Sequence, residues 1–210
     1  MRSLYLILLS SCFVAIIIRH KKLPKPFELF IPLLTLSLAV ELIRFFLDEN
    51  NSISSFFFSI YTPFEYSILS SFYFCVIKNI KVRYSILISI PIFIAISVYI
   101  QFFIQTQNFF YKYLDVLVQS PLICLWSLCV LFQISVDESE MYIKGNPVFW
   151  MAFGNLIFFS GSLFSYGFGS YFLNLKHKDF SDAIFFFAKI LNLILYVFYI
   201  ISFTCSIRRK

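Results

Sequence analysis

Seven runs of apolar residues, separated by short connections, dominate the 210-residue chain. Most runs have the ~20 residues that an α-helix needs to cross a hydrocarbon core ~30 Å thick. Backbone groups in lipid must satisfy their own hydrogen bonds, so each run is predicted to be a helix. The runs cover residues 3–18, 27–47, 55–77, 84–105, 111–134, 148–172 and 182–206.

The composition supports lipid as the solvent for most of this surface. Hydrophobic residues make up 60% of the chain and charged residues only 13%, whereas soluble domains average about 25% charged residues. The short connections leave no room for a separate soluble domain. We therefore predict an all-α fold, a polytopic bundle of seven transmembrane helices in one transmembrane domain over residues 1–210, multi-pass in the cell inner membrane.

The first apolar run is open to a second interpretation. The stretch "LLSSC" ending at Cys12 resembles a bacterial lipobox, which would make Cys12 a lipidated N-terminus. However, the run continues through "FVAIII" and ends at "RHKK", whereas a cleavable signal ends in small or polar residues. We therefore favour a retained helix. None of the five cysteines has CxxC spacing or a histidine placed to complete a zinc site, so packing is their expected role.

The basic residues predict the topology. The connections fall into two alternating sets, one on each side of the membrane. The set that includes the connection after the first run and the C-terminal tail carries 11 of the 17 Lys and Arg residues, and the set that includes the N-terminus carries 4. Two more lie inside apolar runs. Because cytoplasmic loops are enriched in Lys and Arg, the N-terminus is expected outside and the C-terminus inside. The stretch "DENN" then faces outward and the acidic stretch 136–140 is cytoplasmic. The net charge of +6 does not predict nucleic-acid binding, because the basic residues lie in short clusters between apolar runs.

Five charged residues lie within predicted helices, where a central charge costs ~2.5–3.5 kcal/mol and usually faces the bundle interior. At 1.5 Å per residue, Glu65 lies near the midplane, and Glu41 and Lys189 lie roughly 6–7 Å outside it. Asp115 is expected nearer the outer surface, where water solvates it. The five residues are Glu41, Arg44, Glu65, Asp115 and Lys189.

The spacing of polar residues predicts an outward-facing pocket. Lys189, Asn192 and Tyr196 share one side of the last helix, and we expect Lys189 to be the cation of the pocket, paired with Glu41 or Glu65. In the alternative, Glu41 and Arg44 pair with each other and Lys189 extends to the interface. The ligand-pocket candidates are Glu41, Arg44, Glu65, Lys189, Asn192, Tyr196 and Asn155.

Two further features bear on helix geometry. Pro63, just before Glu65, is expected to kink its helix. Gly154 and Gly161 are expected to let another helix approach closely. The run at 84–105 is almost all Ile and Ser, so we predict that it faces lipid.

Three stretches, "KLPKPFELF…ELIRFF", "IYTPFEYSIL" and "NPVFWMAFGNLIFFSG", together resemble a group of small seven-helix membrane proteins from Bacteroidota. Similar segments occur as membrane sensor regions of signalling proteins in that group. The resemblance implies a seven-helix fold and a sensory role, and it assigns no active-site residues. This chain departs from those sensors in ending at "RRK" without an attached kinase or regulator.

Three classes of function are compatible with these features. We expect a non-enzymatic sensor or accessory protein that binds a small or anionic ligand and acts on a cytoplasmic or membrane signalling partner, without a cofactor or metal. A small proton-coupled transporter is the alternative, with Glu65 beside Pro63 as a titrating carboxylate. Two other interpretations are more remote. A retinal-binding protein is disfavoured because Phe185 stands where rhodopsins have an aspartate four residues before the lysine. A lipid-hydrolysing membrane protein is resembled only in "KPFELFIPLL", and the Gly-Asp expected soon after it is absent.

Overall fold

The computed structural model describes residues 2–46, 52–101, 113–136, 145–175 and 178–205. These residues contain seven α-helices, two short 3-10 helices and no strand. The predicted all-α fold class is therefore confirmed. The elements are α1 (Arg2–Arg19), η1 (His20–Lys22), η2 (Lys25–Leu29), α2 (Phe30–Phe46), α3 (Ser52–Val76), α4 (Ile80–Tyr99), α5 (Leu114–Val136), α6 (Pro147–Asn174) and α7 (Lys178–Thr204).

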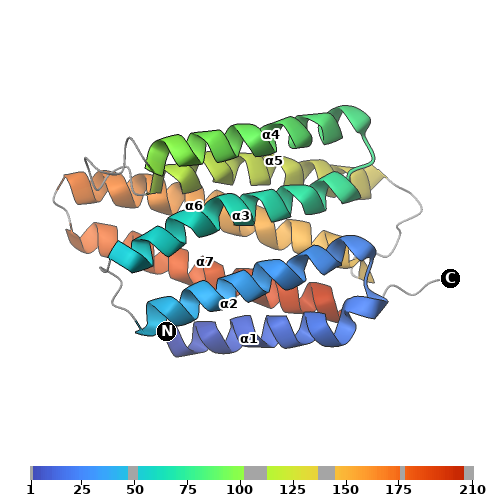
Figure 1. Cartoon of the computed structure of the whole chain (residues 1–210), viewed down its shortest axis with the longest axis horizontal. Helices are drawn as coiled ribbons and strands as arrows, with labels where there is room; N and C mark the ends of the chain where they lie inside the picture. Colours follow the sequence, from blue (N-terminus) through green and yellow to red (C-terminus); the bar gives the residue numbers. More distant parts are fainter. Residues whose placement is uncertain (1, 47–51, 102–112, 137–144, 176–177, 206–210) are drawn as a thin grey trace.

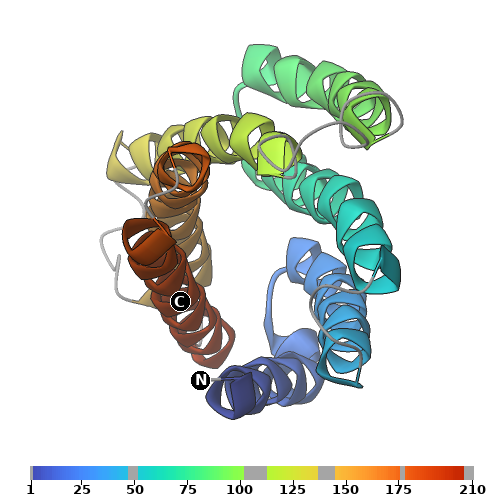
Figure 2. The same cartoon turned by 90° about the vertical axis from the view of Figure 1, so that its left-hand side faces the viewer.

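Six of the α-helices form a closed ring. In sequence around the ring, α1 packs on α2, α2 on α3, α3 on α5, α5 on α6, α6 on α7, and α7 back on α1. Helix α4 lies outside the ring against α3 and α5, and Figure 2 shows this arrangement along the helix axes. The peripheral place of α4 agrees with its uniform apolar sequence. The ring encloses an interior to which α1, α2, α3, α5, α6 and α7 all contribute.

The helices alternate in direction, so the bundle has two distinct ends (Figure 1). We call the end where α1, α3, α5 and α7 finish the basic end, and the other the pocket end. The described residues at the basic end include seven Lys and Arg residues in the α1–α2 and α3–α4 connections and in the adjoining turns of α1 and α4. They are Arg19, Lys21, Lys22, Lys25, Lys78, Lys81 and Arg83.

Six helices are long and apolar enough to cross a membrane, which makes this a multi-pass membrane protein. The candidate spans are Ser3–Lys22, Lys25–Phe46, Ile80–Tyr99, Leu114–Val136, Pro147–Phe172 and Asp179–Thr204. Helix α3 has 25 residues but is not among them. It carries Tyr61, Thr62 and Glu65 in its middle, and these polar side chains lower its hydropathy.

Helix α3 runs without a break through Pro63. A proline inside a helix removes one backbone hydrogen bond and disfavours the regular geometry. The structure nevertheless keeps helical backbone on both sides of Pro63, and Ser67 Oγ donates a hydrogen bond to the Pro63 carbonyl oxygen at 2.7 Å. The interrupted helix considered for a carrier is therefore not seen in this structure.

Aromatic side chains fill the ring near the basic end. Phe27 in η2, Phe30 in α2, Phe72 in α3 and Phe203 in α7 are all buried. Their ring centroids lie 5.1–6.2 Å apart, mostly in edge-to-face contacts, a geometry that aromatic quadrupoles favour. The 3-10 helix η2 brings Phe27 inward against side chains of α2, α3 and α7. We call these four residues the aromatic plug.

The two glycines predicted to permit close helix packing lie where α6 meets α7. A Cβ atom added at Gly154 would lie 2.7 Å from Phe198 Cβ, and one added at Gly161 would overlap the side chain of Leu191. Any larger residue at these positions would push the two helices apart. The predicted close approach is confirmed, and α7 is the partner.

Some topology predictions concern parts of the chain beyond the described residues. They include the outward "DENN" stretch and the cytoplasmic acidic stretch, of which only Val136 is described. The basic residues Lys112, Lys144, Lys176, Arg208, Arg209 and Lys210 also lie outside the described residues.

Candidate functional site

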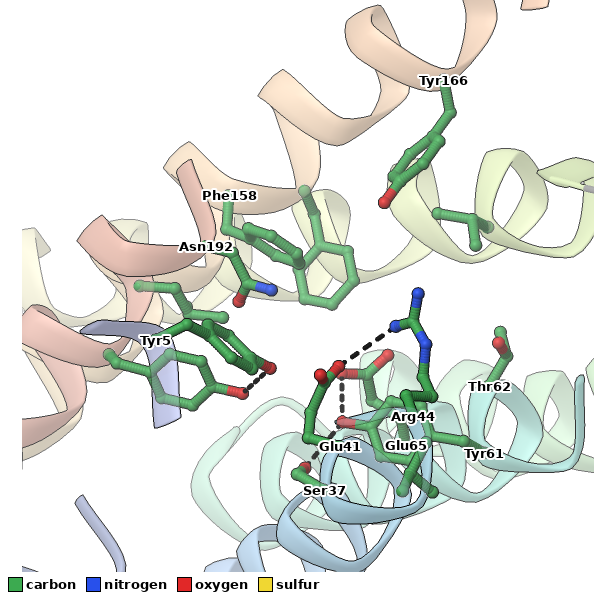
Figure 3. Close-up of a pocket in the computed structure, with 15 residues that line it drawn as sticks. Tyr5, Ser37, Glu41, Arg44, Tyr61, Thr62, Glu65, Phe158, Tyr166 and Asn192 are labelled. Carbon is green, nitrogen blue, oxygen red and sulfur yellow. Dashed lines mark hydrogen bonds and ion pairs between the residues drawn. The ribbon is translucent and has the colours of Figure 1, made fainter. Parts of the chain in front are cut away.

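A polar cavity of about 120 Å³ lies inside the ring, between its middle and the pocket end. Every ring helix contributes to its wall, and Figure 3 shows the polar side chains converging from different helices. The lining residues are Tyr5, Ser37, Val40, Glu41, Arg44, Tyr61, Thr62, Glu65, Val116, Phe158, Phe159, Tyr166, Asn192, Leu195 and Tyr196.

Glu65 is held in this cavity by hydrogen bonds from side chains of two helices. Tyr61, one turn earlier on α3, donates a hydrogen bond to Glu65 Oε1 at 2.9 Å. Gln119 on α5 donates to Glu65 Oε2 at 3.0 Å. Ser37 Oγ on α2 lies 2.9 Å from the Tyr61 hydroxyl oxygen, and Figure 3 shows this contact and the one from Tyr61 to Glu65. Side chains of α2, α3 and α5 therefore hold this carboxyl group in place. Glu65 forms no ion pair with any residue that the structure describes.

Glu41 and Arg44 form an ion pair near the mouth of the cavity. The guanidinium Nη1 of Arg44 lies 3.1 Å from Glu41 Oε1. The two residues are three apart on α2, a spacing that places side chains on one face of a helix. Both side chains are partly exposed, Arg44 at 28% and Glu41 at 23%. The arrangement matches the alternative in which Glu41 and Arg44 satisfy each other.

Tyrosines close the wall where α1 meets α7. The hydroxyl oxygens of Tyr5 and Tyr196 lie 3.2 Å apart, and their rings meet edge to face with centroids 5.4 Å apart. Asn192, one turn before Tyr196, faces the same space (Figure 3). Phe158 and Phe159 on α6 supply an apolar wall. The cavity thus combines carboxyl groups, hydroxyl groups and aromatic rings.

The structure does not bring Lys189 to this cavity. Lys189 is exposed and forms no ion pair among the described residues. It is seven residues from Tyr196 and so projects from nearly the same side of α7, about 10 Å closer to the pocket end. Helix α1 starts at Arg2, only about 4.5 Å before Tyr5. None of the described residues of α1 therefore lies at the level of Lys189.

Asn155 lies in a separate buried cluster and does not line the cavity. Tyr199 donates a hydrogen bond to Asn155 Oδ1 at 2.7 Å, and Asn155 Nδ2 donates to the Tyr73 hydroxyl oxygen at 2.8 Å. Tyr73 is also 2.7 Å from Ser127 Oγ. This polar cluster joins α3, α5, α6 and α7 on the basic-end side of the cavity. Its contacts indicate a structural role for Asn155.

The expectation that water solvates Asp115 is wrong. Asp115 is fully buried at the start of α5. Its Oδ1 accepts a hydrogen bond from the backbone N–H of Val116 at 2.9 Å, and the Thr62 side chain of α3 also hydrogen-bonds to it. The depth estimated from the sequence did not predict this burial, because it takes no account of α3, which packs against α5 and contributes Thr62.

The surroundings of Cys12 bear on the second interpretation of the first apolar run, in which Cys12 is lipidated. Cys12 is buried in an unbroken α1, and its thiol donates to the Tyr196 carbonyl oxygen at 3.2 Å. All five cysteines are free thiols. Burial against α7 fits a packing role better than a lipid attachment point.

Sequence reasoning missed several lining residues. Tyr61 is one helical turn from Glu65, so a search for hydroxyl groups four residues from the buried carboxyl would have found it. Tyr5 is the one aromatic hydroxyl in the first apolar run, which was a weaker signal. Phe158 and Phe159 gave no signal, because 30 phenylalanines are spread over the chain.

No family model, curated protein or solved structure matches this chain. The resemblance to seven-helix proteins of Bacteroidota thus stays a prediction. What the site can do must be argued from its own geometry.

Proposed function

We propose that this protein is a non-enzymatic sensor or accessory protein of the inner membrane, with an outward-facing ligand pocket in a seven-helix bundle. Binding in the cavity would change how the ring helices pack, and a cytoplasmic or membrane partner would respond. The observation that carries this proposal is a polar cavity lined by all six ring helices. A ligand there touches every helix of the ring at once, so its binding energy can favour one packing arrangement over another.

The aromatic plug supports binding at one face of the membrane. Phe27, Phe30, Phe72 and Phe203 pack across the ring between the cavity and the basic end. A cavity that lies toward the pocket end and is separated from the basic end by packed aromatic rings suits a receptor, which needs no path through the membrane.

The charges support an outward orientation of the cavity. The Lys and Arg residues of the α1–α2 and α3–α4 connections gather at the basic end. Under the positive-inside rule that end is cytoplasmic, so the cavity faces outward and the N-terminus lies outside. Helix α3 is counted as the seventh span, because it lies in the ring between α2 and α5 and its polar side chains face the cavity. Polar residues on an inward-facing side need not meet lipid.

A proton-coupled transporter is the second candidate, and Glu65 is the observation in its favour. A carboxyl group inside a membrane cavity is a common proton carrier. Transport would require the aromatic plug to open and the cavity to become accessible from the basic end. The exposed position of Lys189 gives no support to a retinal Schiff base, which needs an enclosed lysine.

Site-specific crosslinking tests the sensor proposal. A photoreactive residue at Lys78 or Lys81 at the basic end should capture a defined partner in cells, and Glu65→Gln should change the yield of that crosslink. The same substitution at exposed Glu28 is the control. The competing outcome is proton uptake into proteoliposomes that depends on Glu65, which would identify a carrier and overturn the sensor proposal.

A further inference from the structure

The cavity holds one carboxyl group without a neighbouring positive charge. Glu41 has Arg44 beside it. Glu65 accepts hydrogen bonds only from the neutral groups of Tyr61 and Gln119, and it forms no ion pair among the described residues. A buried carboxylate is expensive unless a cation or sufficient donors compensate it. The missing charge can come from a ligand.

The walls around Glu65 are suited to a positive charge. Four tyrosines and two phenylalanines line the cavity: Tyr5, Tyr61, Tyr166, Tyr196, Phe158 and Phe159. The face of an aromatic ring attracts cations through its quadrupole, and the attraction grows when the site is desolvated. The hydroxyl oxygens of the tyrosines can also accept hydrogen bonds from an ammonium group.

The cavity is small. Its volume is about 120 Å³, somewhat less than the ~150 Å³ cavity that holds one benzene molecule in an engineered protein. A ligand of roughly four or five non-hydrogen atoms fits this space. No group of three or more His, Cys, Asp or Glu residues that could hold a metal ion occurs in the described parts of the chain.

We propose that the cavity binds a small monovalent organic ammonium ion, with its charged group at Glu65 and its hydrocarbon part against Phe158 and Phe159. The inference rests on the proposed function and names the ligand class for the same pocket. It narrows the small or anionic ligand expected from the sequence to a small cation, because Lys189, the expected cation of the pocket, does not line the cavity. Arg44, the cavity's own cation, is already paired with Glu41.

Binding to the purified full-length protein in nanodiscs tests this assignment. The probe is n-propylammonium, compared with the uncharged propan-1-ol and the anion propionate, each titrated by calorimetry. We expect saturable binding of propylammonium and binding at least tenfold weaker for the other two. Glu65→Gln retains an amide that can meet Tyr61 and Gln119, and it should weaken propylammonium at least tenfold. Glu28→Gln, an identical change at the basic end, should have no effect.

A second variant keeps the test decisive if Glu65→Gln fails to fold. Tyr61→Leu should weaken propylammonium several-fold and leave propan-1-ol nearly unchanged, because Tyr61 lies beside Glu65, where the charged group binds, and only the cation loses an aromatic face there. Equal binding of propylammonium and propan-1-ol, or preferential binding of propionate, would overturn the ammonium assignment. Either result would leave the sensor proposal standing, since the crosslink at the basic end tests that separately.

Discussion

Glu41 and Lys189 are both charged residues near the pocket end, but their surroundings differ. Glu41 is partly enclosed and paired with Arg44, whereas Lys189 is exposed beyond the start of α1. A long lysine side chain in such a place can extend its ammonium group to the interface while its hydrocarbon part stays in lipid. We therefore expect Lys189 to be a tolerated charge near the membrane interface, whereas Glu41 is part of the cavity lining.

The first prediction concerns these two residues. Lys189→Met should change the free energy of unfolding by less than about 0.5 kcal/mol, as exposed substitutions usually do. Combined with Glu41→Leu, the effects should add within about 0.5 kcal/mol. The measurement is a double-mutant cycle on thermal unfolding in detergent. A buried Lys189–Glu41 pair would instead show a coupling of several kcal/mol, because breaking such a pair costs about 3–5 kcal/mol.

A second residue-scale prediction concerns Asn155. Asn155→Leu removes the acceptor of the Tyr199 hydroxyl and one partner of the Tyr73 hydroxyl. A buried polar group left without a partner costs about 1–3 kcal/mol, so the melting temperature should fall clearly. Asn192→Leu is the matched control and should cost less, because Asn192 faces the cavity, where water can replace its contacts. Equal losses for the two variants would argue against the polar cluster.

At the scale of elements, the α6–α7 contact relies on small residues. Gly154→Ala would place a Cβ atom 2.7 Å from Phe198 Cβ, and overpacking of this kind typically costs about 1–3 kcal/mol. Gly167→Ala is the control, since its nearest neighbour would be Leu117 Cδ2 at 3.7 Å. Alanine favours a helix over glycine by up to about 1 kcal/mol, so the control should be neutral or stabilised. Thermal unfolding of both variants measures this, and equal behaviour would contradict the close contact.

The apolar runs predicted where helices occur, but less well where they end. The third and fourth runs were expected from residues 55 and 84, whereas α3 begins at Ser52 and α4 at Ile80. Apolar character marks the part of a helix that meets lipid, whereas the helix continues until a residue caps it. Asn79 caps α4, for example, by accepting a hydrogen bond from the Lys81 N–H at 3.0 Å.

Helical periodicity predicted which residues share a face, but not which neighbour covers that face. Tyr196 and Lys189 project from nearly the same side of α7, yet only Tyr196 meets α1. The outcome depends on where α1 starts and on its packing beside α7, and these two helices are at opposite ends of the sequence. The pairing of α3 with α5, which buries Asp115 and joins Gln119 to Glu65, was likewise not predictable from spacing.

For the whole molecule, the ring of six helices and its two unlike ends determine what the protein can do. The pocket end has the polar cavity, and the aromatic plug lies toward the basic end. Composition alone predicted a multi-pass helical protein, since no soluble fold could bury so many apolar residues. Closure of the ring, with α4 left outside, required the contacts between distant helices.

The central claim is that the cavity opens to the outside of the inner membrane, and accessibility of a single cysteine tests it most directly. In a variant whose five native cysteines are replaced by alanine, Arg44→Cys places a thiol at the partly exposed edge of the cavity. Ile80→Cys places one at the exposed start of α4 at the basic end. The reagent is a membrane-impermeant trimethylammonium methanethiosulfonate, applied to intact spheroplasts. We predict that Arg44→Cys reacts at once and that Ile80→Cys reacts only after permeabilisation. The reverse pattern would place the cavity on the cytoplasmic side and contradict the account.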